Sequence, residues 1–321
     1  MRDKLVNFLK IVISVGLVAW AFAKIDLRQV GAQLATANLW LVLAALALFE
    51  LAIIINGLKW QVLLHAQGIR VPFGALLQFL FTGFFFNNFL PANVGGDVIR
   101  GYGLARYTDR AAGAAVSVVV DRIVGLIGYM STAFVAAVIV VNLNSGEDLQ
   151  QLEWVAFVAL LALLVGFATL LSRRVRALMS RLFALRWLSP LAPLWNRISS
   201  AFDAYRFQYR ALAIAFGLGL LGIVCTAFVN WLLSQSMGGL MPLPTIFLLN
   251  PLIALVLMLP ISIGGIGVSQ AAYPILYGLA GVPPSHALAV SLLMQAIVIL
   301  GSLPGAFFWL RGRQHQAVAD E

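Results

Sequence analysis

The chain has 321 residues, of which 62% are hydrophobic and only 10% are charged. Soluble globular domains are about 45–50% apolar and about 25% charged, so this composition excludes an ordinary soluble enzyme, a disordered chain and a nucleic-acid-binding domain. The single Cys and the three His are too few and too scattered for a disulfide framework or a zinc motif. We therefore expect a protein that is solvated mostly by lipid, with no metal ion and no cofactor.

The net charge of +9 is concentrated in one part of the chain. Residues 173–210 contain eight Arg and one Asp, whereas all other residues together contain 13 basic and 11 acidic side chains. Lys and Arg accumulate in the cytoplasmic loops of membrane proteins. The excess charge therefore indicates topology, and we expect no nucleic-acid partner.

A helix needs about 20 apolar residues to cross the hydrocarbon of a bilayer. Six stretches meet this requirement, and they lie at residues 6–23, 38–58, 111–142, 154–172, 211–235 and 285–310. The first also has the basic start and small-residue end of a secretory signal peptide, but a retained span fits better because the chain downstream is also apolar. We expect an all-α polytopic membrane protein with about six full transmembrane helices, forming a single domain over residues 1–321.

Two further apolar regions, 73–108 and 245–281, are each interrupted near the middle by Pro and Gly. Residues 90–96 read Leu-Pro-Ala-Asn-Val-Gly-Gly, and residues 259–265 read Leu-Pro-Ile-Ser-Ile-Gly-Gly. Pro removes a backbone donor and Gly tolerates unusual backbone angles, so both motifs should unwind a helix. Each region is expected to be a broken helical hairpin, with arms that are either half-helices or nearly full spans. The residues that shape the backbone there are Pro91, Gly95, Gly96, Pro260, Gly264, Gly265 and Gly267.

The Lys and Arg distribution also orients the chain. The N-terminus, the loop after the second span, residues 173–210 and the end of the last span are basic and should be cytoplasmic, while loops 144–148 and 236–244 contain no Lys or Arg. The first hairpin then enters the membrane from inside and the second from outside, which is the pattern of an inverted-topology repeat over residues 24–142 and 211–310. The alternative is two unrelated Pro-Gly loops at the membrane surface. We expect an inner-membrane protein with both termini in the cytoplasm.

The basic segment 173–210 contains Leu178, Leu182, Leu185 and Leu188 at helical spacing among its Arg residues. This pattern is typical of an amphipathic helix lying on an anionic inner leaflet. The alternative is a plain excess of positive charge on the cytoplasmic side.

Ionisable side chains inside a membrane cost about 2.5–3.5 kcal/mol each on insertion scales, so each needs a reason. Glu50 lies near the middle of the second span, and Asp121 and Arg122 lie near the middle of the next long one. Asp97 and Arg100 follow the first Gly-Gly pair, about one helical turn apart. Adjacent helical residues point about 100° apart, so Asp121 and Arg122 need partners elsewhere, and Arg100 and Glu50 are candidates. Such pairs could also be purely structural.

Three motifs follow one another along the chain: Asn88-Phe89-Leu90-Pro91-x-x-x-Gly95-Gly96-Asp97-x-x-Arg100, then Ser117-Val118-Val119-Val120-Asp121-Arg122-x-x-Gly125, then Leu259-Pro260-x-Ser262-x-Gly264-Gly265-x-Gly267. Together they resemble the lysylphosphatidylglycerol synthase transmembrane-region family, also called the flippase-like domain family. The resemblance covers nearly the whole chain. It implies a polytopic inner-membrane protein, and in the best-known members this domain moves an aminoacylated phospholipid between leaflets.

The resemblance also has limits that bear on the lipid. A separate soluble domain makes the lipid in those members, and we expect a stand-alone domain here because the chain ends soon after its last span. The family commonly has Glu where this chain has Gln270, which leaves a different lipid open. Stand-alone relatives are also associated with polyprenyl-linked sugars and with hopanoid gene clusters.

The leading hypothesis is a translocator for a membrane lipid with a phosphate-bearing head group, either a phospholipid, an aminoacyl-phospholipid or a polyprenyl-linked lipid. Glu50 and Asp121 would orient the Arg side chains or titrate. The rival is a membrane enzyme or enzyme subunit acting on a polyprenyl-phosphate-linked sugar, with Asp97 as its tempting carboxylate. A third hypothesis is a scaffold that recruits partners through residues 173–210, and the oligomeric state is open. The expected head-group ligands are Asn88, Asn93, Asp97, Arg100, Arg122, Ser262, Ser269 and Gln270.

Overall fold

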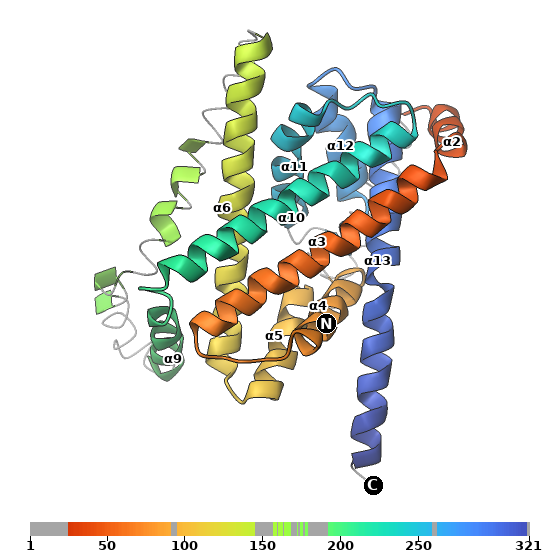
Figure 1. The fold of residues 1–321 in the computed structure, drawn as a ribbon. Helices are drawn as coiled ribbons and strands as arrows, with labels where there is room; N and C mark the ends of the chain where they lie inside the picture. Colours follow the sequence, from red (N-terminus) through yellow and green to blue (C-terminus); the bar gives the residue numbers. More distant parts are fainter. Residues whose placement is uncertain are drawn as a thin grey trace, which may run out of the picture.

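The computed structural model describes residues 25–90, 95–144, 192–258 and 262–319, together with separate positions between 157 and 178. All regular elements in these ranges are α-helices (Figure 1). The expected span at 6–23 lies outside the described residues. The expected span at 154–172 and the basic segment up to residue 191 are described only at separate positions, so the number of crossings stays a prediction.

Four long helices in the described part of the chain are candidate membrane spans. They are α3 (Leu39–Ala66), α6 (Ala111–Asn144), α10 (Tyr209–Ser236) and α13 (Pro284–Ala319). Each provides a largely apolar stretch of 26 or 28 residues, which is long enough to cross a membrane. These helices cover four of the six expected spans, and they confirm an all-helical protein with several membrane-length helices.

Two pairs of shorter helices lie between the long ones, and in each pair the first helix ends and the second begins at a Pro-Gly motif. The first pair is α4 (Phe73–Asn87) and α5 (Gly95–Thr108), and the second is α11 (Leu243–Met258) and α12 (Val268–Gly278). At 1.5 Å per residue, α4 and α11 are about 22–24 Å long, which is less than the roughly 30 Å of bilayer hydrocarbon. The helices thus end and restart at the motifs, as expected from their Pro and Gly content.

A short helix precedes each of the long helices α3 and α10. Helix α2 (Leu27–Ala35) is capped by Asp26, whose carboxylate accepts the Arg28 backbone N–H at 2.9 Å. Helix α9 (Ala192–Asp203) lies within the expected basic segment, and the turn after it carries the fully buried Tyr205. Gln67 donates a hydrogen bond to the Tyr205 hydroxyl at 2.6 Å. Burial raises the pKa of this phenol, so it stays protonated.

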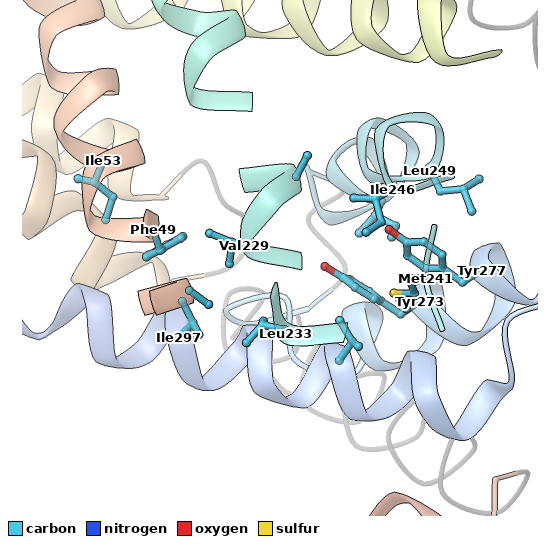
Figure 2. Close-up of a cluster of buried hydrophobic side chains, with 14 of the residues drawn as sticks. Phe49, Ile53, Val229, Leu233, Met241, Ile246, Leu249, Tyr273, Tyr277 and Ile297 are labelled. Atoms are coloured by element: carbon cyan, nitrogen blue, oxygen red, sulfur yellow. The ribbon is translucent and has the colours of Figure 1, made fainter. Parts of the chain in front are cut away.

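Helices α3 and α10 form the centre of the molecule and run antiparallel, side by side (Figure 1). The Asn38 N–H at the start of α3 donates to the Ser236 carbonyl at the end of α10, at 2.9 Å. Small residues allow the close approach, since a Cβ on Gly222 would lie 3.2 Å from Asn56. Apolar side chains from these two helices and from α11, α12 and α13 fill the cluster in Figure 2, which includes Phe49, Ile53, Val229, Leu233, Tyr273, Tyr277 and Ile297.

Candidate functional site

Five charged side chains from three helices form a chain of ion pairs in the protein interior. Lys59 Nζ on α3 lies 3.0 Å from Asp121 Oδ1 on α6. The other oxygen of Asp121 accepts from Arg100 Nη2 on α5 at 2.8 Å, and Arg100 Nε donates to Asp97 Oδ1 at 2.8 Å. Arg122 Nε donates to Asp97 Oδ2. The order is therefore Lys59–Asp121–Arg100–Asp97–Arg122, with positive and negative groups alternating.

The network has three cations and two carboxylates, and its exposure is uneven. The side chains of Lys59, Asp121, Arg100 and Asp97 are 6–10% exposed, whereas that of Arg122 is 34% exposed. Buried charges are tolerated only when each has a partner of opposite sign. Arg122 is therefore the most accessible of the three cations.

Sequence reasoning missed Lys59 because it treated this residue as a loop charge after a span ending at residue 58. Helix α3 instead continues to Ala66, so Lys59 lies inside the helix. Gly125 of α6 and Gly219 of α10 lie beside its side chain: a Cβ on Gly125 would lie 3.7 Å from Lys59 Nζ, and one on Gly219 would lie 3.5 Å from Cδ, both at ordinary contact distance. The largely apolar residues that follow Lys59, up to Ala66, were the available signal, because they allow the helix to continue past residue 58.

Arg100 is further held by an aromatic ring. Its guanidinium lies over the Trp60 indole, 4.8 Å from the ring centroid. The indole nitrogen in turn donates to the Ser117 hydroxyl at 3.1 Å. A cation over the face of Trp is stabilised electrostatically, so Arg100 is fixed by two carboxylates and an aromatic face.

The network borders a cavity of about 340 Å³ between the helices. Residues of α3, α4, α5 and α6 and residues of α10, α11, α12 and α13 line it. All five network members line it, and they are the charged residues among the described lining. The second half of the chain supplies neutral groups, among them Asn230, Asn250, Ser269 and Tyr273. The charged groups at the cavity thus all come from the first half of the chain.

Two Tyr–Asn hydrogen bonds lie in the second half of the chain, and three of their four residues, Tyr273, Asn230 and Asn250, line the cavity. The Tyr273 hydroxyl donates to Asn230 Oδ1 at 2.8 Å, and the Tyr277 hydroxyl donates to Asn250 Oδ1 at 2.7 Å. The ring centroids of Tyr273 and Tyr277 are 5.7 Å apart, and the two rings lie next to each other in Figure 2. These pairs satisfy polar groups in an apolar surrounding, and Asn230 and Asn250 keep further donor capacity at the cavity.

The first broken hairpin is held by close backbone contact. The Gly96 N–H at the start of α5 donates to Asn87 Oδ1 at the end of α4, at 2.7 Å. A Cβ on Gly83 would lie 2.6 Å from the Gly96 carbonyl oxygen. Asn88 donates to the Ser302 hydroxyl on α13 at 2.8 Å and lines the cavity. Asn87, Asn88 and Gly96 therefore tie the ends of α4 and α5 to each other and to α13.

The second motif lies against the first. Gly264, Gly265 and Gly267 have φ angles of +60°, +75° and +84°, a region that glycine adopts without strain. The Gly264 N–H contacts the Leu90 carbonyl at 3.5 Å. A Cβ on Gly264 would lie 2.8 Å from the carbonyl oxygen of Asn88. The two broken hairpins thus meet at the cavity.

Replacing Gly264 by Ala should lower the thermal stability of the purified protein by about 1–2 kcal/mol or more. The left-handed backbone alone costs an L-residue about this much, and the clash with the Asn88 carbonyl adds to it. Gly217→Ala is the control, because Gly217 lies within α10 and no atom lies within 4 Å of the position that its added methyl group would occupy. A melting temperature of Gly264→Ala equal to that of Gly217→Ala would contradict this account.

The remaining expected site residues are distributed as follows. Ser269 lines the cavity, whereas Ser262 and Gln270 are buried away from it. Gln270 accepts the Gly267 N–H at 2.7 Å and so caps the start of α12. Asn93, Pro91 and Pro260 lie outside the described residues.

Glu50 is not brought to the network. Lys59 follows it by nine residues on α3, which is half a turn away in angle, so the two side chains leave opposite faces of the helix. Glu50 is half-buried near Gly301 of α13 and makes no ion pair with a described residue. The expected pairing of Asp121 with Arg100 is present, but Glu50 does not orient either Arg side chain through an ion pair in this arrangement.

The membrane-length helices define the class of multi-pass membrane proteins, and the ion pairs line a cavity between these helices. The family model of the lysylphosphatidylglycerol synthase transmembrane region matches residues 7–305, and the chain belongs to this family. A relative from Pyrococcus horikoshii, described as UPF0104 membrane protein PH1989, is 22% identical over 330 residues. The match covers 96% of this chain and 98% of that relative.

Proposed function

We propose that this protein translocates a lipid with a phosphate-bearing head group between the two leaflets of the membrane. The observation that carries the proposal is the alternating ion network, which has one excess positive charge and its most exposed cation, Arg122, at the cavity. Phosphate prefers the planar, charged donor fork of Arg. The family is named after the transmembrane part of an enzyme whose product, lysylphosphatidylglycerol, is such a lipid.

The hydrogen bonds of Asp97 favour lipid transport over an enzymatic reaction. Both of its carboxylate oxygens accept hydrogen bonds from Arg side chains, Oδ1 from Arg100 and Oδ2 from Arg122. Because each oxygen already accepts a hydrogen bond from a guanidinium group, neither oxygen is available to a substrate without the loss of a contact to Arg100 or Arg122. We therefore propose a translocator and not an enzyme acting on a polyprenyl-phosphate-linked sugar.

The proposed architecture is an inverted repeat in which α2 to α6 correspond to α9 to α13. Helices α3 and α10 have 28 residues each, and α4 and α11 have 15 and 16. Exchanging the two sets preserves the pattern of neighbours: α4 touches α13 while α11 touches α6, and α2 touches α13 while α9 touches α6. Such reciprocal contacts are what a two-fold relation produces.

The direction of the proposed axis follows from the central pair. Equivalent helices that run antiparallel are related by an axis perpendicular to them, and α3 and α10 are both of membrane-spanning length. The axis then lies in the membrane plane, with the cavity on it. Counted from the starts of their helices, Asp121 and Arg122 correspond to Met294 and Gln295, and all four line the cavity. In this arrangement α4 and α5 are re-entrant from the cytoplasm, and α11 and α12 are re-entrant from outside.

Cysteine labelling should place the two hairpins on opposite sides of an inner membrane. In a Cys225→Ser background, Leu240→Cys should react with an impermeant maleimide added outside, because Leu240 is exposed in the loop before α11. Tyr107→Cys, at the exposed end of α5, should react only after permeabilisation. Labelling of both positions from the same side would contradict the inverted repeat.

Translocation itself is tested by reconstitution into vesicles. Chain-labelled phosphatidylglycerol should exchange between leaflets faster with the protein than without it, and extracted lipid should be chemically unchanged. A chain-labelled glucosyldiacylglycerol, whose head group has no phosphate, is the matched control and should exchange no faster with the protein. Conversion of the lipid, or equal acceleration of both lipids, would reject the proposal.

A further inference from the structure

We infer that a second, apolar pocket between α6, α10 and α11 binds one hydrocarbon chain of the lipid whose phosphate occupies the charged cavity. This inference rests on the proposed function and assigns the pocket as the chain subsite of the same site. The pocket has a volume of about 410 Å³. It is lined by residues 131–139 of α6, by Leu220 of α10 and by the first turns of α11.

The pocket offers no polar atom to a ligand. Its two hydroxyl-bearing residues are Ser131 and Thr132, and both hydroxyls donate to carbonyls of their own helix, Ser131 to Ile127 at 2.8 Å and Thr132 to Tyr129 at 2.9 Å. The accessible lining is accordingly apolar. A dry apolar cavity of roughly 150 Å³ is already enough to bind benzene, so this pocket has room for a segment of hydrocarbon chain.

The pocket continues the charged cavity along one face of α6. Arg122, Gly125, Leu126 and Tyr129 line the cavity, and Thr132, Ala136 and Ile139 line the pocket. Apart from the adjacent Gly125 and Leu126, these positions recur every three or four residues, which places them in one stripe along the helix. Phe247 of α11 lines both spaces and forms their common wall. One ligand lying along this stripe would meet charge at one end and only hydrocarbon at the other.

The distance from Arg122 to the near end of the pocket matches the thickness of one leaflet. Ser131 and Ile139 follow Arg122 by nine and 17 residues, which is about 14 and about 25 Å along a helix. One leaflet contributes about 15 Å of the hydrocarbon thickness, so a chain that starts from a phosphate at Arg122 reaches the near end of the pocket, at Ser131. The chain then points toward the end of α6 that the proposed topology places outside, which is how lipids of the inner leaflet are oriented. The second chain stays in the bilayer.

The proposal is tested by mapping where the end of a lipid chain lies. The probe is phosphatidylglycerol with a diazirine at the end of one acyl chain, bound to the full protein in nanodiscs and cross-linked by light. Labelled residues should concentrate between 131 and 139 and between 243 and 247. Val135→Trp, which fills the pocket from a side chain that is 56% exposed, should remove most of this labelling, because the indole occupies the space of the chain. Val119→Trp is the matched control on the same helix, since Val119 is 45% exposed and lines neither space.

Two further outcomes decide whether the pocket and the cavity act as one site. Arg122→Gln should lower the pocket labelling, and an unlabelled phosphatidylglycerol whose chains are too short to reach residue 131 should compete less well than one with full-length chains. Labelling that is insensitive to Val135→Trp, or equal in the parent and Arg122→Gln, would overturn the inference. The experiment measures binding without any transfer step, so it succeeds or fails independently of the vesicle assay that tests translocation.

Discussion

Replacing Arg122 by Gln should leave a folded protein that transfers the lipid about tenfold to a hundredfold more slowly. Asp97 keeps its bond to Arg100 when Arg122 is removed, so no carboxylate is left alone in the interior. The remaining network has two cations and two carboxylates, and the cavity loses its excess positive charge. Hydrogen bonds to charged groups contribute about 1.5–3 kcal/mol, which corresponds to this range of rates if the contact forms as the head group enters.

The measurement is leaflet exchange of labelled phosphatidylglycerol in vesicles with equal amounts of protein. Arg106→Gln provides the control, because Arg106 is an exposed residue of α5 that does not line the cavity. Arg122→Lys keeps the charge without the two-pronged donor geometry and should fall between the parent and Arg122→Gln. Loss of Arg122→Gln protein from the membrane would instead assign this side chain a structural role.

Arg100 should behave differently from Arg122, although sequence reasoning assigns both the same role. Arg100 bonds both carboxylates and lies over Trp60, so its removal strands Asp121 and Asp97 at one bond each. The order of the ion pairs depends on how α3, α5 and α6 pack against one another. Spacing along the chain identified the members Asp97, Arg100, Asp121 and Arg122, but it does not encode which of them remains accessible.

The course of the helices was largely readable from the sequence because membrane helices are specified by apolar length and are interrupted by Pro and Gly. The motif at 90–96 follows the end of α4 at Asn87 and runs into the start of α5 at Gly95, and the motif at 259–265 lies between the end of α11 at Met258 and the start of α12 at Val268. A short-range signal was sufficient there, since the interruption is a local backbone property. The correspondence of helix neighbours between the two halves is a long-range property, and only the packed structure reveals it.

The surroundings of Lys59 and Glu50 could not be predicted from the sequence. Both are charges on α3, and a rule that counts charges assigns Lys59 to a loop and Glu50 to the membrane interior. The helix continues past Lys59 and turns it toward Asp121, while Glu50 leaves the opposite face of the same helix. Which face a charge occupies depends on the neighbouring helices, so a single span cannot supply this information.

Removing the carboxylate of Asp121 should destabilise the protein by about 3–5 kcal/mol, the expected effect of breaking a buried ion pair at one partner. Asp121→Asn leaves Lys59 without its carboxylate and Arg100 with only one, and both are nearly fully buried. The melting temperature and the amount of protein in the membrane should fall, whereas Asp109→Asn, at an exposed position between α5 and α6 with a φ of +53° that Asn also tolerates, should match the parent. Adding Lys59→Met to Asp121→Asn removes one of the stranded cations and should restore part of the lost stability. An Asp121→Asn protein as stable as Asp109→Asn would mean that the network positions its Arg side chains without holding the three helices together.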